Sequence, residues 1–398
     1  MALCGGKKRV KVSRFFFTRV MLTAWVLLLS YQYLDYFYAY LAHGEWLDLE
    51  NGFTRILIPD TFIYKSIIDT DNVWLSIILS GVKNTIGPSF IWYAAQFDWF
   101  IVLFINVVII WFIFVFFEKN LNYYGVSPRV AQHTMLVFAL LPSTSFYAIG
   151  ALKELPTMLL LLMLVYFYNR RRLFIVLWVS VALIFFRYQL IVILLGTVAI
   201  TRFNNRSFRF SLFAIIALSL IYPVIISFGM LEMEAVERFR SSQTETYGAI
   251  IENIRNNYYG FSFFAIVVRV LQTLFEPMFG FIPNPIEYFY EEGMFSIFRF
   301  VQVSTILIMM PYIYKTVFKM INLYRLDGYL HNSINALYVI ILLSFFLVGG
   351  FSFIHHRYLV PFFPLIMIAA IIPLSTSLHT TTPIPKKSIP LAPTRGEW

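Results

Sequence analysis

The feature that most constrains this chain is a series of apolar runs separated by short polar segments. Many of the runs reach the 18 or more residues with which an α-helix crosses a bilayer core of about 30 Å. Only 13% of the residues are charged, about half the share that soluble domains carry. The runs do not alternate apolar and polar residues, as the strands of a transmembrane barrel would. The sequence therefore predicts an all-α polytopic membrane protein.

We expect about 10 transmembrane helices in one membrane domain that covers residues 1–377. The expected spans are 17–41, 99–117, 130–150, 155–168, 173–186, 189–201, 210–229, 294–317, 332–352 and 358–376. Two long outer loops, 43–98 and 230–293, are expected to carry interfacial helices. Residues 378–398 are rich in Pro and Thr and are expected to form a disordered cytoplasmic tail.

The distribution of charge orients these spans. Several Lys and Arg residues precede the first span, and basic residues also concentrate in the other segments that this topology places in the cytoplasm. By the positive-inside rule, both termini are cytoplasmic and the loops 43–98 and 230–293 face outward. The stretch Phe261–Gly280 could also span, but every later loop would then be inverted, so we expect an outer-surface helix there.

Several classes of function are excluded or disfavoured. The single cysteine, Cys4, allows no disulfide within the chain and no cysteine-based metal site. The net charge of +10 follows from the cytoplasmic loops and does not indicate a nucleic-acid partner. No nucleotide-binding loop, dinucleotide fingerprint or metalloprotease helix is present. We therefore do not expect the chain to use ATP or a nucleotide-linked substrate directly.

Ionisable residues lie at the outer ends of three pairs of spans, where basic residues are disfavoured. They are Lys153 and Glu154, Arg187, and His356 with Arg357. Charged groups at this depth are candidates for function, and guanidinium groups bind phosphate oxygens in a bidentate fork. This pattern predicts a site for the phosphate or diphosphate of a lipid. The alternative is structural: contact with lipid head groups, or ion pairing such as Lys153 with Glu154.

The first outer loop carries a candidate catalytic carboxylate, Asp60. It follows Pro59 and precedes Tyr64 by four residues, so a helix that begins at Asp60 would place both side chains on one face. A carboxylate there could serve as a general base, or it could only cap the helix. Other acids of the loop, such as Asp69 and Asp71, could hold Mg²⁺ or Mn²⁺, although no spacing specifies a metal site.

Three segments resemble the GT-C class of integral-membrane glycosyltransferases. Pro59-Asp60-Thr-Phe-Ile-Tyr64 is similar to the catalytic first loop of bacterial members. The segment 141–154, which is rich in small residues and ends in Lys153-Glu154, is similar to the turn of an early hairpin. Arg357-Tyr-Leu-Val-Pro-Phe-Phe-Pro364 is similar to the Arg-Tyr and Pro-x-x-Pro pattern of their last part. The chain departs from many members in lacking an obvious second acid close to Asp60 and a C-terminal outer domain.

The resemblance implies an inverting glycosyltransferase in the bacterial cytoplasmic membrane, active on the outer face. It would move a sugar from a polyprenyl-phosphate or polyprenyl-diphosphate donor to a glycan, lipid or protein acceptor. Asp60 would be the base, and Tyr64, Lys153, Glu154, Arg187, His356 and Arg357 would bind substrate. The alternative is an O-antigen or exopolysaccharide polymerase that uses the arginines between 238 and 255. A transporter would need inverted repeats and broken midplane helices in both halves, which the sequence does not show.

Overall fold

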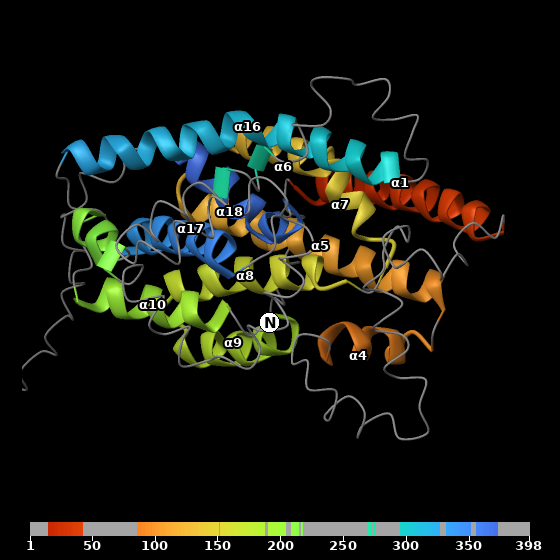
Figure 1. Cartoon of the computed structure of the whole chain (residues 1–398), viewed down its shortest axis with the longest axis horizontal. Coiled ribbons are helices and arrows are strands. Elements are labelled where there is room, and N and C mark those ends of the chain that lie inside the picture. Colours follow the sequence, from red (N-terminus) through yellow and green to blue (C-terminus); the bar gives the residue numbers. More distant parts are fainter. Residues whose placement is uncertain are drawn as a thin grey trace, which may run out of the picture.

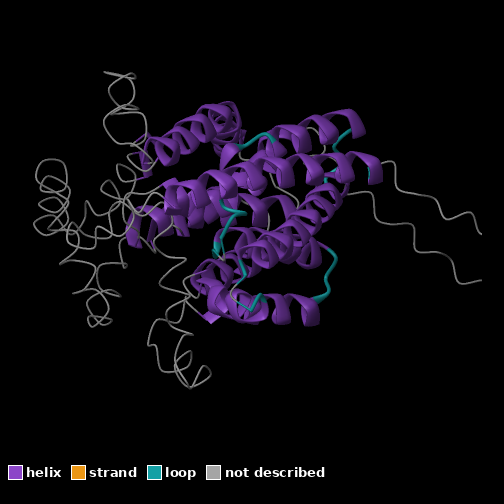
Figure 2. Cartoon of the chain, turned by 90° about the vertical axis from the view of Figure 1, so that its right-hand side faces the viewer, coloured by secondary structure: helices purple, strands orange, loops and turns teal. Residues whose placement is uncertain are grey.

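The structure is a computed structural model of the chain. The residues that it describes are 15–42, 86–96, 98–150, 152–187, 190–203, 208–214, 216–217, 270–271, 274–275, 295–326, 332–351 and 356–372. These residues are helical with short connections and contain no strand (Figure 2). The all-α class predicted from the sequence is confirmed for this part of the chain.

The described helices form a bundle (Figure 1). In chain order they are α1 (Phe16–Ala42), α4 (Ile86–Ala94), α5 (Trp99–Tyr123), α6 (Pro128–Ala139), α7 (Pro142–Phe146), α8 (Glu154–Asn169), α9 (Leu173–Arg187), α10 (Leu190–Phe203), α16 (Phe295–Leu326), α17 (Asn332–Phe351), the 3₁₀-helix η5 (His356–Phe362) and α18 (Phe363–Ile371). Helix α8 lies in the middle and packs against α5, α9, η5 and α17. Helix α16 runs along one edge and packs on α18 and α7.

Among the described residues, two helices are long and apolar enough to cross a membrane, α5 over Trp99–Tyr123 and α16 over Phe300–Tyr324. Asp98 caps the start of α5, because its Oδ1 accepts hydrogen bonds from Phe100 N at 2.7 Å and Ile101 N at 3.1 Å. Helices α8 and α9 are shorter apolar helices. The predicted count of spans is not settled by these helices and stays a prediction.

Two predicted spans differ from the helices in the structure because of proline. The span predicted at 130–150 divides into α6 and α7, because Pro142 has no N–H and its ring would clash with the carbonyl of Phe138 in a continuous helix. The span predicted at 358–376 begins as the 3₁₀-helix η5, which contains Pro361, and continues as α18 with Pro364 in its first turn. By contrast, α16 continues past the predicted end at residue 317 and through Pro311 to Leu326.

Lys319 links α16 to α18 by hydrogen bonds. The predicted topology placed Lys319 after the span, but it lies within α16. Its Nζ donates to the carbonyl oxygens of Ala369 at 3.1 Å, Ala370 at 2.6 Å and Ile372 at 2.6 Å. These carbonyls belong to the last turn of α18, which has no partners of its own within the helix. The lysine therefore caps α18 from the neighbouring helix.

The outer loops are described only in part. Helix α4 lies near the end of the predicted outer loop 43–98, where interfacial helices were expected, and it packs against α9 and α5. A Cβ on Gly87 of α4 would lie 2.5 Å from the ring of Phe186, so glycine permits this close approach. Asp60, the loop 230–269, most of Phe261–Gly280 and the tail 378–398 lie outside the described residues.

Candidate functional site

The candidate site begins with a buried segment, residues 141–150, that contains α7 and leads toward α8. Each of these residues except Pro142 is buried. Three helices hold the segment by hydrogen bonds. Asn106 Nδ2 of α5 donates to the carbonyl oxygens of Ala148 and Gly150, both at 2.8 Å. Ser30 Oγ of α1 donates to Ser145 O at 2.9 Å, and Thr305 Oγ1 of α16 accepts from Ser143 N at 3.2 Å.

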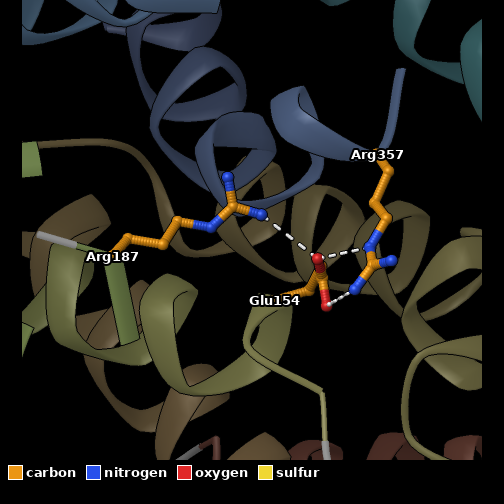
Figure 3. A network of polar contacts seen from close by, with 3 residues as sticks. All are labelled: Glu154, Arg187 and Arg357. Carbon is orange, nitrogen blue, oxygen red and sulfur yellow. Dashed lines mark hydrogen bonds and ion pairs between the residues drawn. The ribbon is translucent and has the colours of Figure 1, made fainter. Parts of the chain in front are cut away.

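Glu154 follows this segment, and its carboxylate lies between two arginines. Arg357 Nε donates to Glu154 Oε1 at 2.6 Å, and Arg357 Nη2 donates to Oε2 at 3.2 Å. Arg187 Nη2 donates to Oε1 at 3.1 Å. The two guanidinium groups approach the carboxylate from opposite sides (Figure 3). The side chains of Glu154, Arg187 and Arg357 are 0%, 8% and 14% exposed, so the whole group is nearly removed from solvent.

The helix ends at which Glu154 and Arg187 lie stabilise the charges of these two side chains. Glu154 lies in the first turn of α8, where the helix dipole favours a carboxylate. Arg187 lies in the last turn of α9, where the dipole favours a cation. Each guanidinium group also stacks on a tyrosine ring, Arg187 over Tyr358 at 5.2 Å and Arg357 over Tyr147 at 5.9 Å. These contacts fix both arginines beside the carboxylate.

The ionisation of Glu154 follows from competing effects. The residue precedes the apolar stretch of α8. Burial raises the pKa of the Glu154 carboxyl. The charges of Arg357 and Arg187, together with the hydrogen bond from Arg357, lower this pKa by more than burial raises it. The net result is a pKa below the ordinary value, so Glu154 is ionised at neutral pH. Together these three side chains carry one net unit of positive charge.

Arg187 retains hydrogen-bonding capacity that Glu154 does not use. Its Nε is buried and has no hydrogen-bond partner among the described residues. A buried donor without a partner is costly, and a guanidinium group carries five N–H donors. The arrangement can therefore accept a further anion, with Glu154 holding the two arginines in place.

The structure places some of the predicted site residues together. The three turns expected on one face bring Glu154, Arg187 and Arg357 into contact. Lys153 occupies the N-cap position of α8, is half-buried, and its charge also lowers the pKa of Glu154. His356 begins η5 beside Arg357, but its side chain is not among those described. Asp60 and Tyr64 lie outside the described residues, so their predicted roles stay predictions.

Sequence reasoning missed three residues of the site. Tyr147 and Tyr358 stack on the arginines. Tyr147 lies within the segment 141–154 and Tyr358 within 357–364, both of which were noted for their family resemblance. Asn106 fixes the segment before Glu154, and the signal for it was present: a polar amide in the middle of an apolar run. Asn106 is only 1% exposed, whereas an asparagine that faced the lipid would be exposed at the surface of the bundle.

A second ion pair lies between α1 and α5, joining Arg19 to Glu118 at 3.5 Å. Arg19 also stacks on Trp111 at 5.2 Å. Arg19 lies near the predicted cytoplasmic end of the first span and Glu118 directly follows the second, whereas the Glu154 group belongs to turns predicted to be outer. No group of three or more His, Cys, Asp or Glu residues that could hold a metal occurs in the described part of the chain. The first-loop acids proposed as ligands for Mg²⁺ or Mn²⁺ lie outside that part.

Comparison of the chain with protein-family models, with curated proteins and with solved structures gave no match.

Proposed function

We propose that this chain is a multi-pass glycosyltransferase of the GT-C type in a bacterial cytoplasmic membrane, with both termini in the cytoplasm. It would transfer a sugar from a polyprenyl-phosphate or polyprenyl-diphosphate donor to a glycan, lipid or protein acceptor on the outer face. The observation that carries the proposal is the buried group of Glu154, Arg187 and Arg357, which has an excess of positive charge. The rest of the support is the resemblance of residues 59–64, 141–154 and 357–364 to that family.

The charge of this group suits a phosphate leaving group. In a single displacement, the acceptor oxygen forms a bond to the anomeric carbon while the bond from that carbon to the phosphate oxygen breaks, which inverts the anomeric centre. The bonding electrons leave with the phosphate, so negative charge develops there. Arg187 and Arg357 would stabilise this charge in a site of low dielectric, where fixed donors act most strongly.

The remaining residues complete the proposed reaction. Asp60 would take the proton of the acceptor hydroxyl as its oxygen attacks. Tyr64, Lys153 and His356 would bind the sugar and phosphate groups, and Glu154 would keep the two arginines oriented. The donor carries its own leaving group, so the reaction needs no nucleotide. Mg²⁺ or Mn²⁺ at the first-loop acids would supply further positive charge near the phosphate.

The proposed base is tested with two matched variants. Wild type, Asp60→Asn and Asp98→Asn are purified in detergent and incubated with a polyprenyl-linked glycan extract, and consumption of lipid-linked sugar is followed by mass spectrometry. Asp98 is an acid of the same predicted outer segment, and asparagine caps a helix as well as aspartate does. We expect Asp98→Asn to retain activity and Asp60→Asn to lose it while keeping the wild-type melting temperature. Equal activity of Asp60→Asn and wild type would show that Asp60 is not the base, and would favour a polymerase that uses the arginines of 238–255.

A further inference from the structure

An apolar slot lies between α8, α9, α10 and α17, with a volume of about 370 Å³. Helix α9 contributes more lining residues than any other of these helices. The α9 residues that line it are Leu173, Val176, Leu177, Ser180, Val181 and Ile184. Their spacing of three and four places them on one face of the helix. The slot follows this face for roughly 16 Å, at 1.5 Å per residue.

The hydroxyls among the described lining residues already hold hydrogen bonds within the bundle. Ser180 Oγ donates to Val176 O at 2.8 Å, within its own helix. Thr197 Oγ1 donates to Ile193 O at 2.7 Å, and the Tyr168 hydroxyl pairs with Thr201 Oγ1 at 3.2 Å. A lining of this apolar kind accepts hydrocarbon. Leu173, Leu177 and Leu195 line the slot and are exposed, so it opens sideways toward the surface of the bundle.

The apolar face of α9 ends at a buried cation. Arg187 lies three residues after Ile184, so it continues the face that lines the slot, one helical turn beyond its end. On the opposite wall, Glu154 precedes Tyr168 by 14 residues, which is four turns, and therefore lies on the α8 face that contributes Tyr168. The slot thus leads toward the Glu154 group, where Arg187 Nε lacks a partner among the described residues.

We infer that this slot binds the isoprenoid chain of a lipid phosphate whose phosphate is held by Arg187. The inference rests on the proposed function, because it assigns to the proposed donor a position on this chain. An apolar slot whose α9 face ends one turn before the buried Arg187 is complementary to one apolar chain with an anionic head. The exposed leucines on its rim provide lateral entry from the bilayer.

A photoreactive lipid tests the inference without requiring sugar transfer. A polyprenyl phosphate with a diazirine in its chain is incorporated with the full-length protein into phosphatidylcholine nanodiscs and irradiated. Labelled peptides are then identified by mass spectrometry. Two further probes carry the same diazirine, a polyprenol that lacks the phosphate and a phosphatidylglycerol. We expect the polyprenyl phosphate to label residues 164–198 and the polyprenol to label them at least about tenfold less, the effect of losing hydrogen bonds to a charged group. The phosphatidylglycerol keeps a phosphate but carries two acyl chains, and we expect it also to label them at least about tenfold less, because the slot is complementary to one chain.

Matched variants separate the slot from the surrounding bilayer. Ser180→Trp fills the slot, whereas Ala199→Trp adds the same side chain on the exposed side of α10, where Ala199 does not line it. We expect Ser180→Trp to abolish labelling and Ala199→Trp to preserve it. Arg187→Gln, which leaves the slot intact, should lower labelling about tenfold or more. Melting temperatures of all variants establish that each is folded.

The possible outcomes distinguish this inference from the proposed function. Equal labelling by the polyprenol or by phosphatidylglycerol would overturn the inference, as would labelling that Ser180→Trp leaves unchanged. Specific labelling of the slot in a protein that transfers no sugar from any lipid donor would retain the lipid-phosphate site and overturn the proposed transferase. Sugar transfer accompanied by labelling only outside residues 164–198 would overturn the slot and leave the transferase standing.

Discussion

Arg357 and Glu154 are separated by 203 positions in the chain, yet Arg357 Nε lies 2.6 Å from Glu154 Oε1. With the second bond from Nη2 to Oε2, the pair has the bidentate geometry that arginine makes with carboxylates. Arg187 completes the group from α9. The ion pairs therefore join the start of α8, the end of α9 and η5, and the stability of this end of the bundle depends on Glu154.

Removing the charge of Glu154 should destabilise the fold strongly. Glu154→Gln removes the charge of the carboxylate that both buried guanidinium groups bind, and loss of one partner of a buried pair costs about 3–5 kcal/mol. Glu118→Gln is the matched control, since the ion pair of Glu118 with Arg19 is longer, at 3.5 Å. We expect the melting temperature in detergent to fall much further for Glu154→Gln. Equal shifts for the two variants would contradict the central position of Glu154.

Substitution by lysine should lower stability to different extents at Arg357 and Arg187. Arg357 makes two hydrogen bonds to Glu154 and Arg187 makes one. Lysine keeps the charge but cannot form the bidentate fork. Arg357→Lys should therefore lose about 1.5–3 kcal/mol, the value of a hydrogen bond to a charged group, while Arg187→Lys should lose less. Chemical denaturation of both variants in the same detergent measures the difference. A greater loss for Arg187→Lys would show that the bidentate pair does not dominate.

Stability should also depend on pH through Glu154. Its pKa is lowered in the folded chain, so below the ordinary value of 4.5 the unfolded chain binds the proton first. The contribution of the ion pairs is complete above pH 4.5 and is lost as pH falls further, through the lowered pKa. Melting temperatures between pH 3 and 7 should therefore fall less steeply for Glu154→Gln than for wild type. Parallel curves would show that Glu154 does not contribute to the acid dependence.

Asn106 should be important for the segment before Glu154. Asn106→Ala leaves the carbonyls of Ala148 and Gly150 without this donor, and each buried group without a partner costs about 1–3 kcal/mol. Asn122→Ala, an exposed change in the same helix, is the control. We expect only Asn106→Ala to lower stability and to speed hydrogen exchange in residues 141–153. Unchanged exchange in that segment would mean that α1 and α16 hold it without Asn106.

The sequence predicted some features of the fold and the site better than others. The apolar runs predicted α1, α5 and α17 closely, because their length and composition leave little choice. The spans predicted at 130–150 and 358–376 are not continuous α-helices, since Pro142 and Pro361 interrupt them. The alternation of spans predicted that Glu154, Arg187 and Arg357 lie on one face. It could not predict that both arginines bind Glu154, because periodicity assigns a residue to a face and does not reveal which helices pack together.

The central claim is that Arg187 and Arg357 stabilise the phosphate that departs from a lipid-linked sugar. The most direct measurement is the release of polyprenyl phosphate from polyprenyl-phosphate monosaccharides, followed by mass spectrometry in proteoliposomes. Wild type is compared with Arg187→Gln, with the melting temperature of each recorded. We predict release by wild type and about 10²–10³-fold slower release by the folded variant, the effect of removing one donor to a developing anion. Release at the wild-type rate by Arg187→Gln, or no release by wild type from any such donor, would contradict the account.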